Sequence, residues 1–284
     1  YEFMDRKLSV AENEEIVIAN DAMSFDQYLN ARRFHLVINV FYNDGVFKDI
    51  FGFLKYVGIR KYDWLIRIHQ SNHDGLNTLM KDFLDESSNE LWKDRTSLQE
   101  FTSDENRINE YLSGDRGSNL IFKYKSIGIT KHVNALQEAA VSALGGLISE
   151  LDGVEDHHYV VGEEILRYDS RKMTQIFDCE VPVISDTFSY DIERLVDEEG
   201  YAHCEDYKFA QPRKIQFFKT PEQDGLIQRY VNVYGNDTVG LSRILAKVYV
   251  GGLLRKPRTT PVSQEEEKAM RFGQTKLSGL NPFV

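Results

Sequence analysis

The most constraining feature of this sequence is a helix-start signal followed at once by apolar residues at helical spacing. Ser24 stands three positions before Gln27, the arrangement of a capping box, in which both side chains satisfy free backbone N–H groups. Leu36 and Val40 follow at an interval that places them on one helix face. The pattern predicts an amphipathic helix that ends near Gly45, where glycine suits a C-cap.

Helical patterns recur along the rest of the chain. Ser97 and Glu100 form a second capping-box pair, and Thr220 precedes Pro221, a residue favoured at the first helical position. Residues 120–124 fit either a strand or the start of a long helix. We predict further helices over 46–56, 62–69, 76–84 and 127–151, from 97 onward, over 220–234 and from 238 onward.

The character of the sequence changes after Gly153, where short β-like runs appear among the helical patterns. Predicted strands cover 15–19 near the start and 175–177, 181–184, 187–190 and 213–218 in the second half. We therefore predict a predominantly helical α+β fold, in which a helical half with a short strand precedes a mixed half with a few short strands and two C-terminal helices. The predicted domains are a helical subdomain over 1–153, a mixed α/β subdomain over 154–258 and a polar tail over 259–284.

Composition excludes several classes of protein. The 284 residues carry 34 basic and 45 acidic side chains, a net charge of −11, which gives no general attraction to nucleic acid or anionic membranes. Two cysteines, Cys179 and Cys204, are too few for a zinc site made mainly of thiolates or for an all-cysteine iron–sulfur cluster. The scarcity of cysteine, the charged start and the lack of a long apolar run favour a cytoplasmic protein. The chain starts without an initiator Met, so we expect a fragment or a processed product.

Glycine-rich phosphate-binding motifs are missing from the sequence. No P-loop pattern occurs, and no Gly-x-Gly-x-x-Gly follows a strand. The nearest glycine-rich loop runs from Gly114 to Gly117, and because it contains an acidic residue and no lysine it is a poor anion site.

Metal-ligating residue types gather at one place, Asp156-His157-His158 with Glu163 and Glu164 shortly after. Adjacent histidines point in different directions on a helix or a strand, so we expect only one of the pair to join a carboxylate around an ion. A solvated polar connector is the favoured interpretation, and a metal hydrolase built on this cluster is kept as a weaker alternative.

The other candidates are also better explained without catalysis. The carboxylates beside His203 and Cys204 disfavour a thiolate, and Asp191 and Glu193 are predicted to share one strand face without a catalytic role. Phe47, Phe51 and Trp64 are predicted to be core residues. His35 and His69 are predicted to be packed or surface side chains. Two basic clusters, Arg32-Arg33 and Arg255-Lys256 with Arg258, are predicted to lie on the surface. We assign no catalytic and no metal-binding residue.

One longer phrase carries a family resemblance. Residues 15–28 read as a short strand, a Met-Ser turn and a helix start, and the helix runs through 31–33 to Phe-Tyr-Asn at 41–43. This phrase resembles the region just downstream of the radical S-adenosylmethionine (SAM) barrel in cobalamin-binding radical SAM proteins. The similarity covers most of residues 15–256. Further similar positions are Glu90-Leu91-Trp92, Phe188-Ser189-Tyr190-Asp191, Tyr234-Gly235 and Leu241-Ser242-Arg243.

The resemblance implies a function for the parent enzyme that this chain cannot perform alone. Such enzymes cleave SAM with a four-iron cluster held by a CxxxCxxC loop, and many bind cobalamin in an N-terminal Rossmann-like domain. This sequence has no CxxxCxxC, so no cluster ligand is carried over and its cofactor-binding residues are unknown. The implied role is a C-terminal accessory domain that closes the barrel, excludes water and shapes the substrate site. Its partners would be the radical SAM and cobalamin-binding domains of the same parent polypeptide.

A second hypothesis from another class is a self-contained helical module that binds a protein partner. The helical stripes without a catalytic motif motivate it. A capping domain should expose one broad apolar face, whereas an interaction module should present a bounded groove.

Overall fold

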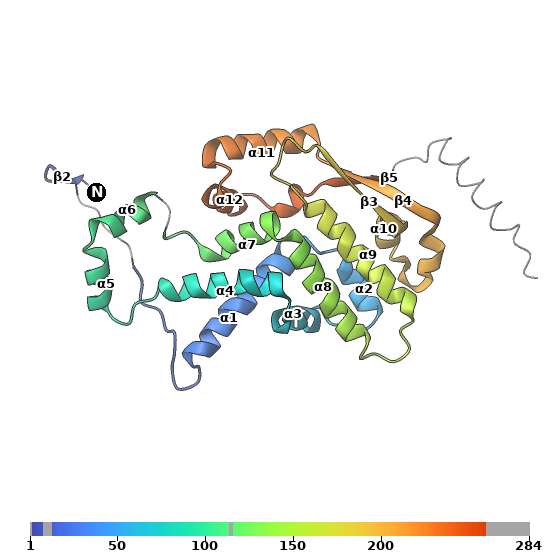
Figure 1. The fold of residues 1–284 in the computed structure, drawn as a ribbon, viewed down its shortest axis with the longest axis horizontal. Helices are drawn as coiled ribbons and strands as arrows, with labels where there is room; N and C mark the ends of the chain where they lie inside the picture. The colour runs from blue at the N-terminus through green and yellow to red at the C-terminus, as the bar shows by residue number, and fades with distance from the viewer. Residues whose placement is uncertain (1, 8–12, 114–115, 260–284) are drawn as a thin grey trace, which may run out of the picture.

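The computed structural model describes residues 2–7, 13–113 and 116–259. In this part of the chain the fold is α+β and predominantly helical, which confirms the predicted class. Helices build most of the body, and a three-stranded antiparallel sheet lies on one side of it (Figure 1). The N-terminal half contains β1 (Glu2–Phe3), β2 (Arg6–Lys7), α1 (Phe25–Ile38), η1 (Asn39–Asn43), α2 (Ile50–Tyr56), α3 (Lys61–Gln70), α4 (Asp74–Asn89), α5 (Arg95–Thr102), α6 (Glu105–Ser113), α7 (Leu120–Lys131) and α8 (Val133–Ile148). The C-terminal half contains α9 (Asp156–Met173), β3 (Val183–Tyr190), α10 (Ile192–Asp197), η2 (Gly200–Tyr207), β4 (Lys208–Phe218), α11 (Pro221–Tyr234), α12 (Thr238–Leu245), η3 (Val250–Gly252) and β5 (Lys256–Thr259).

An aromatic cluster forms the centre of the helical body. Trp64 of α3 is fully buried and packs edge-on against Phe41 and Phe47, with ring centroids 6.1 and 6.5 Å away. Its indole N–H donates a 3.1 Å hydrogen bond to the carbonyl of Ala140 on α8, which satisfies the one polar group of this large side chain. Phe51 is partly buried against the same core. The prediction that these aromatic residues are core is confirmed.

The sheet has the order β3-β4-β5 and rests on α9. Phe188 of β3 and Phe217 of β4 pack against Tyr168 of α9, with ring centroids 5.8 and 5.3 Å from the tyrosine ring. The buried core is continuous through α8, α9 and the sheet. The predicted subdomain boundary after Gly153 therefore lies in a loop between two helices that pack against each other.

Several predicted helices have different bounds in the structure. The capping box of Ser24 and Gln27 is present, and α1 continues into one π-helical turn, η1. The helix predicted over 127–151 is divided, because α7 ends at Lys131 and α8 begins at Val133. Residues 120–124 belong to α7, and α5 is capped by Asp94, which accepts a hydrogen bond from the backbone of Ser97, and not by Ser97 itself.

Two of the predicted strands are wrong. Residues 15–19 are extended but make no backbone hydrogen bond to any described part of the chain, so they form no sheet. Residues 175–177 form a turn, and Gln175 there has a positive φ of 51°. The strand predicted at 187–190 and residues 183–184 of the one predicted at 181–184 are parts of β3, whereas 181–182 precede it, and 213–218 belongs to β4. Nearly all of the predicted polar tail, residues 260–284, lies outside the described residues.

Gly162 allows α9 to approach α8 and α2 closely. A Cβ atom there would lie 2.6 Å from Cδ2 of Leu144 and 2.8 Å from Cε1 of Phe53, well inside van der Waals contact. We expect Gly162→Ala to lower the free energy of unfolding by about 1–3 kcal/mol, because the core must shift to make room. Gly225→Ala on α11 is the matched control, since nothing lies within 4 Å of its Cβ position. That control should stabilise by about 0.4–1 kcal/mol, and urea denaturation of both variants would test the contrast.

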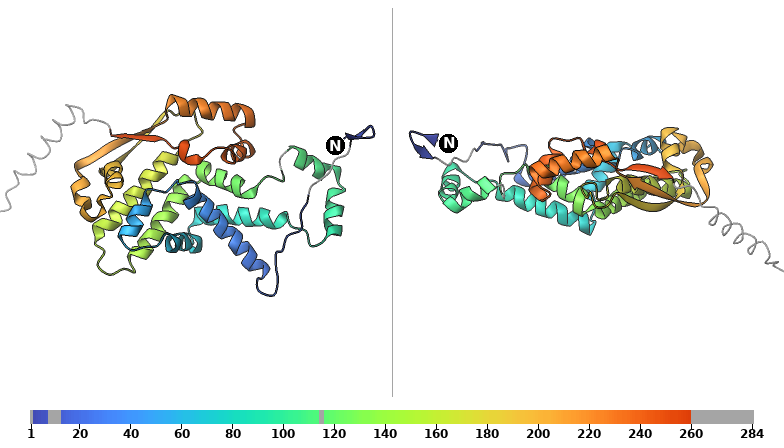
Figure 2. Two further views of the ribbon diagram at one scale, coloured as in Figure 1. Left: turned by 180° about the vertical axis from the view of Figure 1, so that it is seen from behind. Right: turned by 90° about the horizontal axis from the view of Figure 1, so that it is seen from above.

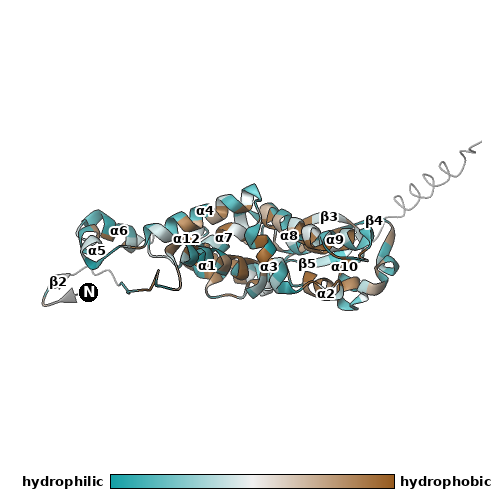
Figure 3. Ribbon diagram, turned by 90° about the horizontal axis from the view of Figure 1, so that it is seen from below, coloured by the Kyte–Doolittle hydropathy of each residue, from teal (hydrophilic) through white to brown (hydrophobic). Residues whose placement is uncertain are grey.

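The helices α5 and α6 project from one end of the molecule, away from the main body (Figures 1 and 2). Neither contains a buried residue, and both are largely hydrophilic in Figure 3. The extended segment 13–19 passes between this arm and the body (Figure 1). Among the described residues, no helix is both long enough and apolar enough to cross a membrane.

Candidate functional site

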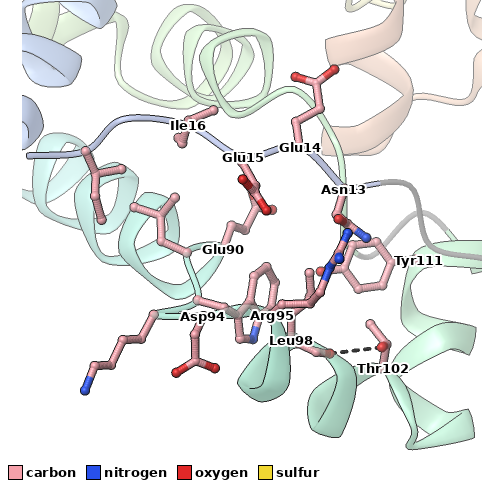
Figure 4. Close-up of a pocket in the computed structure, with 15 residues that line it drawn as sticks. Asn13, Glu14, Glu15, Ile16, Glu90, Asp94, Arg95, Leu98, Thr102 and Tyr111 are labelled. Carbon is pink, nitrogen blue, oxygen red and sulfur yellow. Dashed lines mark hydrogen bonds between the residues drawn. The ribbon is translucent and has the colours of Figure 1, made fainter.

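A cavity of about 550 Å³ lies where the extended N-terminal segment crosses the arm. One wall is formed by residues 13–18, and the other by the α4–α5 connection with parts of α5 and α6. Glu15 points into this cavity, while the carboxylates of Glu14 and Asp94 point away from it (Figure 4). The further side chains that matter for its chemistry are Glu90, Trp92, Arg95 and Tyr111.

The inner wall of this cavity is acidic and partly desolvated. Burial, together with the neighbouring charge of Glu86, raises the pKa of Glu90, although a backbone hydrogen bond from Gly117 opposes that shift. Burial and the charge of Glu90 raise the pKa of the Tyr111 hydroxyl. The raised pKa values mean that negative charge is disfavoured at this wall, so a ligand that donates hydrogen bonds or carries positive charge would be favoured there.

Aromatic and ionic contacts hold the arm together. The ring centroids of Trp92 and Phe101 lie 5.0 Å apart. The Arg107 guanidinium also contacts Phe101, at 5.5 Å from the centre of its ring. Arg107 also pairs with Glu110 at 2.9 Å, and Glu110 in turn pairs with Arg116. Because α5 and α6 contain no buried residue, these contacts, and not an apolar core, hold the wall of the cavity.

The lining residues do not contain a nucleophile paired with a base. Thr102, the one lining hydroxyl besides Tyr111, donates a 2.9 Å hydrogen bond to the carbonyl of Leu98 (Figure 4). A nucleophilic mechanism needs an adjacent general base within hydrogen-bond reach, and the described lining residues offer none to Thr102. The Thr102 hydroxyl is therefore not activated as a nucleophile by any described lining residue.

The acidic residues considered from the sequence have structural roles. Glu164 is buried, and its carboxylate accepts hydrogen bonds from the backbone N–H groups of Ser189 and Tyr190, at 2.9 and 3.1 Å. This contact ties β3 to α9. Asp191 and Glu193 are not on a strand, because Asp191 caps α10 and Glu193 lies within that helix.

Residues 156–164 belong to α9 and do not form a connector. The expectation that His157 and His158 diverge is also wrong, since their ring centroids are 4.1 Å apart. Both histidines lie close to Cys204, while Glu164 faces the sheet. The histidine pair thus joins a cysteine from another element and not the downstream carboxylates.

The predicted surface position is wrong for Arg255 and is confirmed for Lys256 and Arg258. Arg255 is fully buried, and its guanidinium donates hydrogen bonds to four backbone carbonyls. Arg258 on β5 donates an exposed hydrogen bond to the side-chain oxygen of Gln216. Arg33 donates to Asn77, and the Arg32 guanidinium lies 5.5 Å from the ring of Phe83.

The isolated histidines and the cysteines show no catalytic arrangement. His69 is buried and bonds to Asn30 at 3.0 Å, and burial, with the charge of Arg33, lowers its pKa. His35 is exposed on α1. Cys179 and Cys204 are both free thiols. Of the loop at 114–117, the first two residues lie outside the described residues, and Arg116 pairs with Glu110.

Sequence reasoning did not single out the cavity. Its acidic wall is formed by Glu15 and Glu90, which are distant in the chain and belong to no spacing motif. The available signal was the family resemblance, because it includes both the 15–28 phrase and Glu90-Leu91-Trp92. No family model, curated protein or solved structure matches this chain.

Proposed function

We propose that this chain is an accessory domain that covers the substrate side of a cobalamin-dependent radical SAM enzyme. The cavity between residues 13–18 and the arm would face the catalytic barrel. In this proposal the chain holds no iron–sulfur cluster, SAM or cobalamin of its own. Those cofactors are bound by the radical SAM and cobalamin-binding domains of the same parent polypeptide.

The observation that carries the proposal is the state of the extended segment. Residues 15–19 belong to the phrase that resembles the family, and Glu15, Ile16 and Ile18 among them line the cavity. Their backbone is unpaired within the described chain, and the side chains of Ile16 and Val17 are 52% and 68% exposed. An extended apolar segment with free backbone groups offers an edge to which another chain segment can pair.

The chemistry of the cavity is consistent with a covering role. A radical intermediate must be kept from water and from side reactions, and this requires walls and not additional reactive groups. The lining of aromatic rings, carboxylates and Arg95 can contact a substrate without offering a nucleophile paired with a base. The second candidate is a module that binds a protein partner, for which the apolar side chains of Ile16, Ile18, Leu91, Trp92 and Leu98 in the same cavity would supply contacts.

The proposal predicts an uncoupling effect in the parent enzyme. We expect Ile16→Asp with Val17→Asp to reduce product formed per SAM cleaved by about tenfold, or about 1.4 kcal/mol, because charge at the junction would weaken closure. Val233→Asp on α11 is the matched control, since Val233 is similarly exposed at 67%. The products 5′-deoxyadenosine and methylated or rearranged substrate would be quantified in parallel.

Three results would contradict the proposal, and the first two concern the parent enzyme. One is a parent coding frame with no CxxxCxxC upstream of Tyr1, and the other is unchanged coupling in the double variant. Stoichiometric assembly of an iron–sulfur cluster by this chain alone, seen as a brown chromophore after anaerobic reconstitution, would equally oppose it.

A further inference from the structure

Three metal-ligating side chains converge between the start of α9 and η2. The helix α9 lies on the side of the molecule away from α5 and α6 (Figure 1). His157 and His158 lie in the first turn of α9, and Cys204 lies in η2. One ligand atom from each residue can be chosen so that all three atoms lie within 4.8 Å of one another. The Cys204 side chain is 2% exposed, so its sulfur faces the histidines from a buried position.

A neighbouring carboxylate orients the first histidine. Oε2 of Glu155 lies 3.1 Å from Nδ1 of His157, a distance at which Nδ1–H donates to the carboxylate. The hydrogen is then on Nδ1, and Nε2 keeps the lone pair that a metal requires. A carboxylate behind a ligating histidine is the usual outer-shell arrangement of protein metal sites.

The second histidine has weaker present partners. Nδ1 of His158 accepts a long hydrogen bond of 3.3 Å from the backbone N–H of Glu155, and Nε2 lies 3.4 Å from the hydroxyl of Tyr56. Ligation through Nδ1 or Nε2 would replace the long hydrogen bond of that nitrogen with a bond to the metal.

The cysteine is suited to the same role. Cys204 is a buried free cysteine whose thiol carries one proton, and its ligand atom lies within 4.8 Å of one nitrogen of each histidine. A bound cation would displace that proton, because the thiolate and not the thiol is the metal ligand.

We propose that His157, His158 and Cys204 bind one divalent ion of borderline softness, with Zn²⁺ as the representative ion. Two imidazoles and one thiolate suit this class, whereas Mg²⁺ and Ca²⁺ require oxygen ligands. Three protein ligands leave a fourth position for water or an added ligand. The ion would link the start of α9 to η2, two elements about 40 positions or more apart in the chain. The proposal departs from the sequence assignment of no metal-binding residue, and it does not depend on the proposed accessory function.

Metal titration of the whole chain tests this site. Metal-free protein is titrated with Co²⁺, and we expect one ion per chain and a thiolate-to-cobalt absorption band that one equivalent of Zn²⁺ removes. Cys204→Ser should abolish that band and weaken Zn²⁺ binding by about 100-fold or more, since even outer-shell partners contribute about 10–100-fold. Cys179→Ser is the matched control, because Cys179 is the other free cysteine, and it should leave the band unchanged.

A second variant keeps the test decisive if Cys204→Ser does not fold. His157 lies near the surface, and His157→Gln should weaken Zn²⁺ binding strongly while the circular dichroism spectrum of the metal-free chain stays unchanged. The proposal is overturned if the unsubstituted chain shows no saturable binding of Co²⁺ or Zn²⁺. It is equally overturned if one-ion binding persists unchanged in either folded variant.

Discussion

Replacing Arg255 by methionine is expected to lower the free energy of unfolding by about 3–5 kcal/mol. The Arg255 side chain lies fully inside the protein, and its guanidinium donates hydrogen bonds of 2.7–3.1 Å to the carbonyls of Thr174, Gln175, Val181 and Pro182. Methionine fills similar volume but leaves these four acceptors without their donor, and unpaired buried polar groups are each costly.

The variants that accompany this change separate hydrogen bonding from charge. Arg255→Lys keeps the charge but should recover only part of the loss, because an ammonium group cannot reproduce the planar fork of a guanidinium. Arg258→Met is the matched control on β5, where the guanidinium makes a 3.2 Å bond to Gln216 at the surface, and should change stability by less than about 0.5 kcal/mol. Urea unfolding followed by tryptophan fluorescence and circular dichroism would measure all three. A loss below about 1 kcal/mol for Arg255→Met would show that the carbonyls find other donors.

Replacing Lys172 by methionine is expected to cost a similar amount, about 3–5 kcal/mol. The Lys172 ammonium lies 2.5 Å from Oδ2 of Asp49 and 2.7 Å from Oδ1 of Asp169, and Asp169 has no exposed surface. Although burial lowers the pKa of Lys172, the charges of Asp169 and Asp49 outweigh it and raise that pKa overall. Without the ammonium, two carboxylates would face each other in the interior with no cation between them.

The same variant should show a changed pH dependence. Burial raises the pKa of Asp169, and Lys172 opposes that shift, so removing Lys172 would raise the carboxyl pKa further. In the folded variant the Asp169 carboxyl binds its proton more tightly than in the unfolded chain. Its stability should therefore increase as the pH falls from about 7 to about 5, and decrease again as the pH rises through the raised pKa.

An exposed ion pair provides the control for the buried one. Lys81 pairs with Asp85 on α4, with side chains 73% and 58% exposed, and Lys81→Met should cost no more than about 0.5 kcal/mol. The double variant Lys172→Met with Asp169→Leu should recover part of the loss. It removes the carboxylate of Asp169, which is fully buried, and leaves only the carboxylate of Asp49, which is slightly exposed. Equal stability of the Lys172 and Lys81 variants would contradict a structural role for the buried cluster.

Local sequence predicted local structure well where the deciding partners are neighbours in the chain. The capping box predicted at Ser24 marks the start of α1, and the Thr220-Pro221 pair marks the start of α11, because both signals act within a few residues of the helix start. Residues 15–19 show the limit of the same reasoning. Their β-branched side chains favour extended backbone, and the backbone is extended, but a strand also needs a partner that the described chain does not provide.

The predicted candidate site changed for a related reason. The sequence placed His157 and His158 beside Asp156 and Glu163, since only nearby residues can be grouped by spacing. The fold instead brings Cys204 to the histidines and turns Glu164 toward β3. A ligand set assembled from two elements leaves no periodic signal in the sequence.

The sequence by itself determined that this chain is a mainly helical α+β protein, and it located most of the helices, because helix propensity, capping and apolar spacing act over a few residues. Only the tertiary structure decided that Arg255 is buried, that Lys172 joins Asp49 to Asp169, and that the cavity forms between residue 15 and residue 90. Each of these contacts joins groups far apart in the chain, and their energies come from burial and charge pairing that exist only after the elements pack.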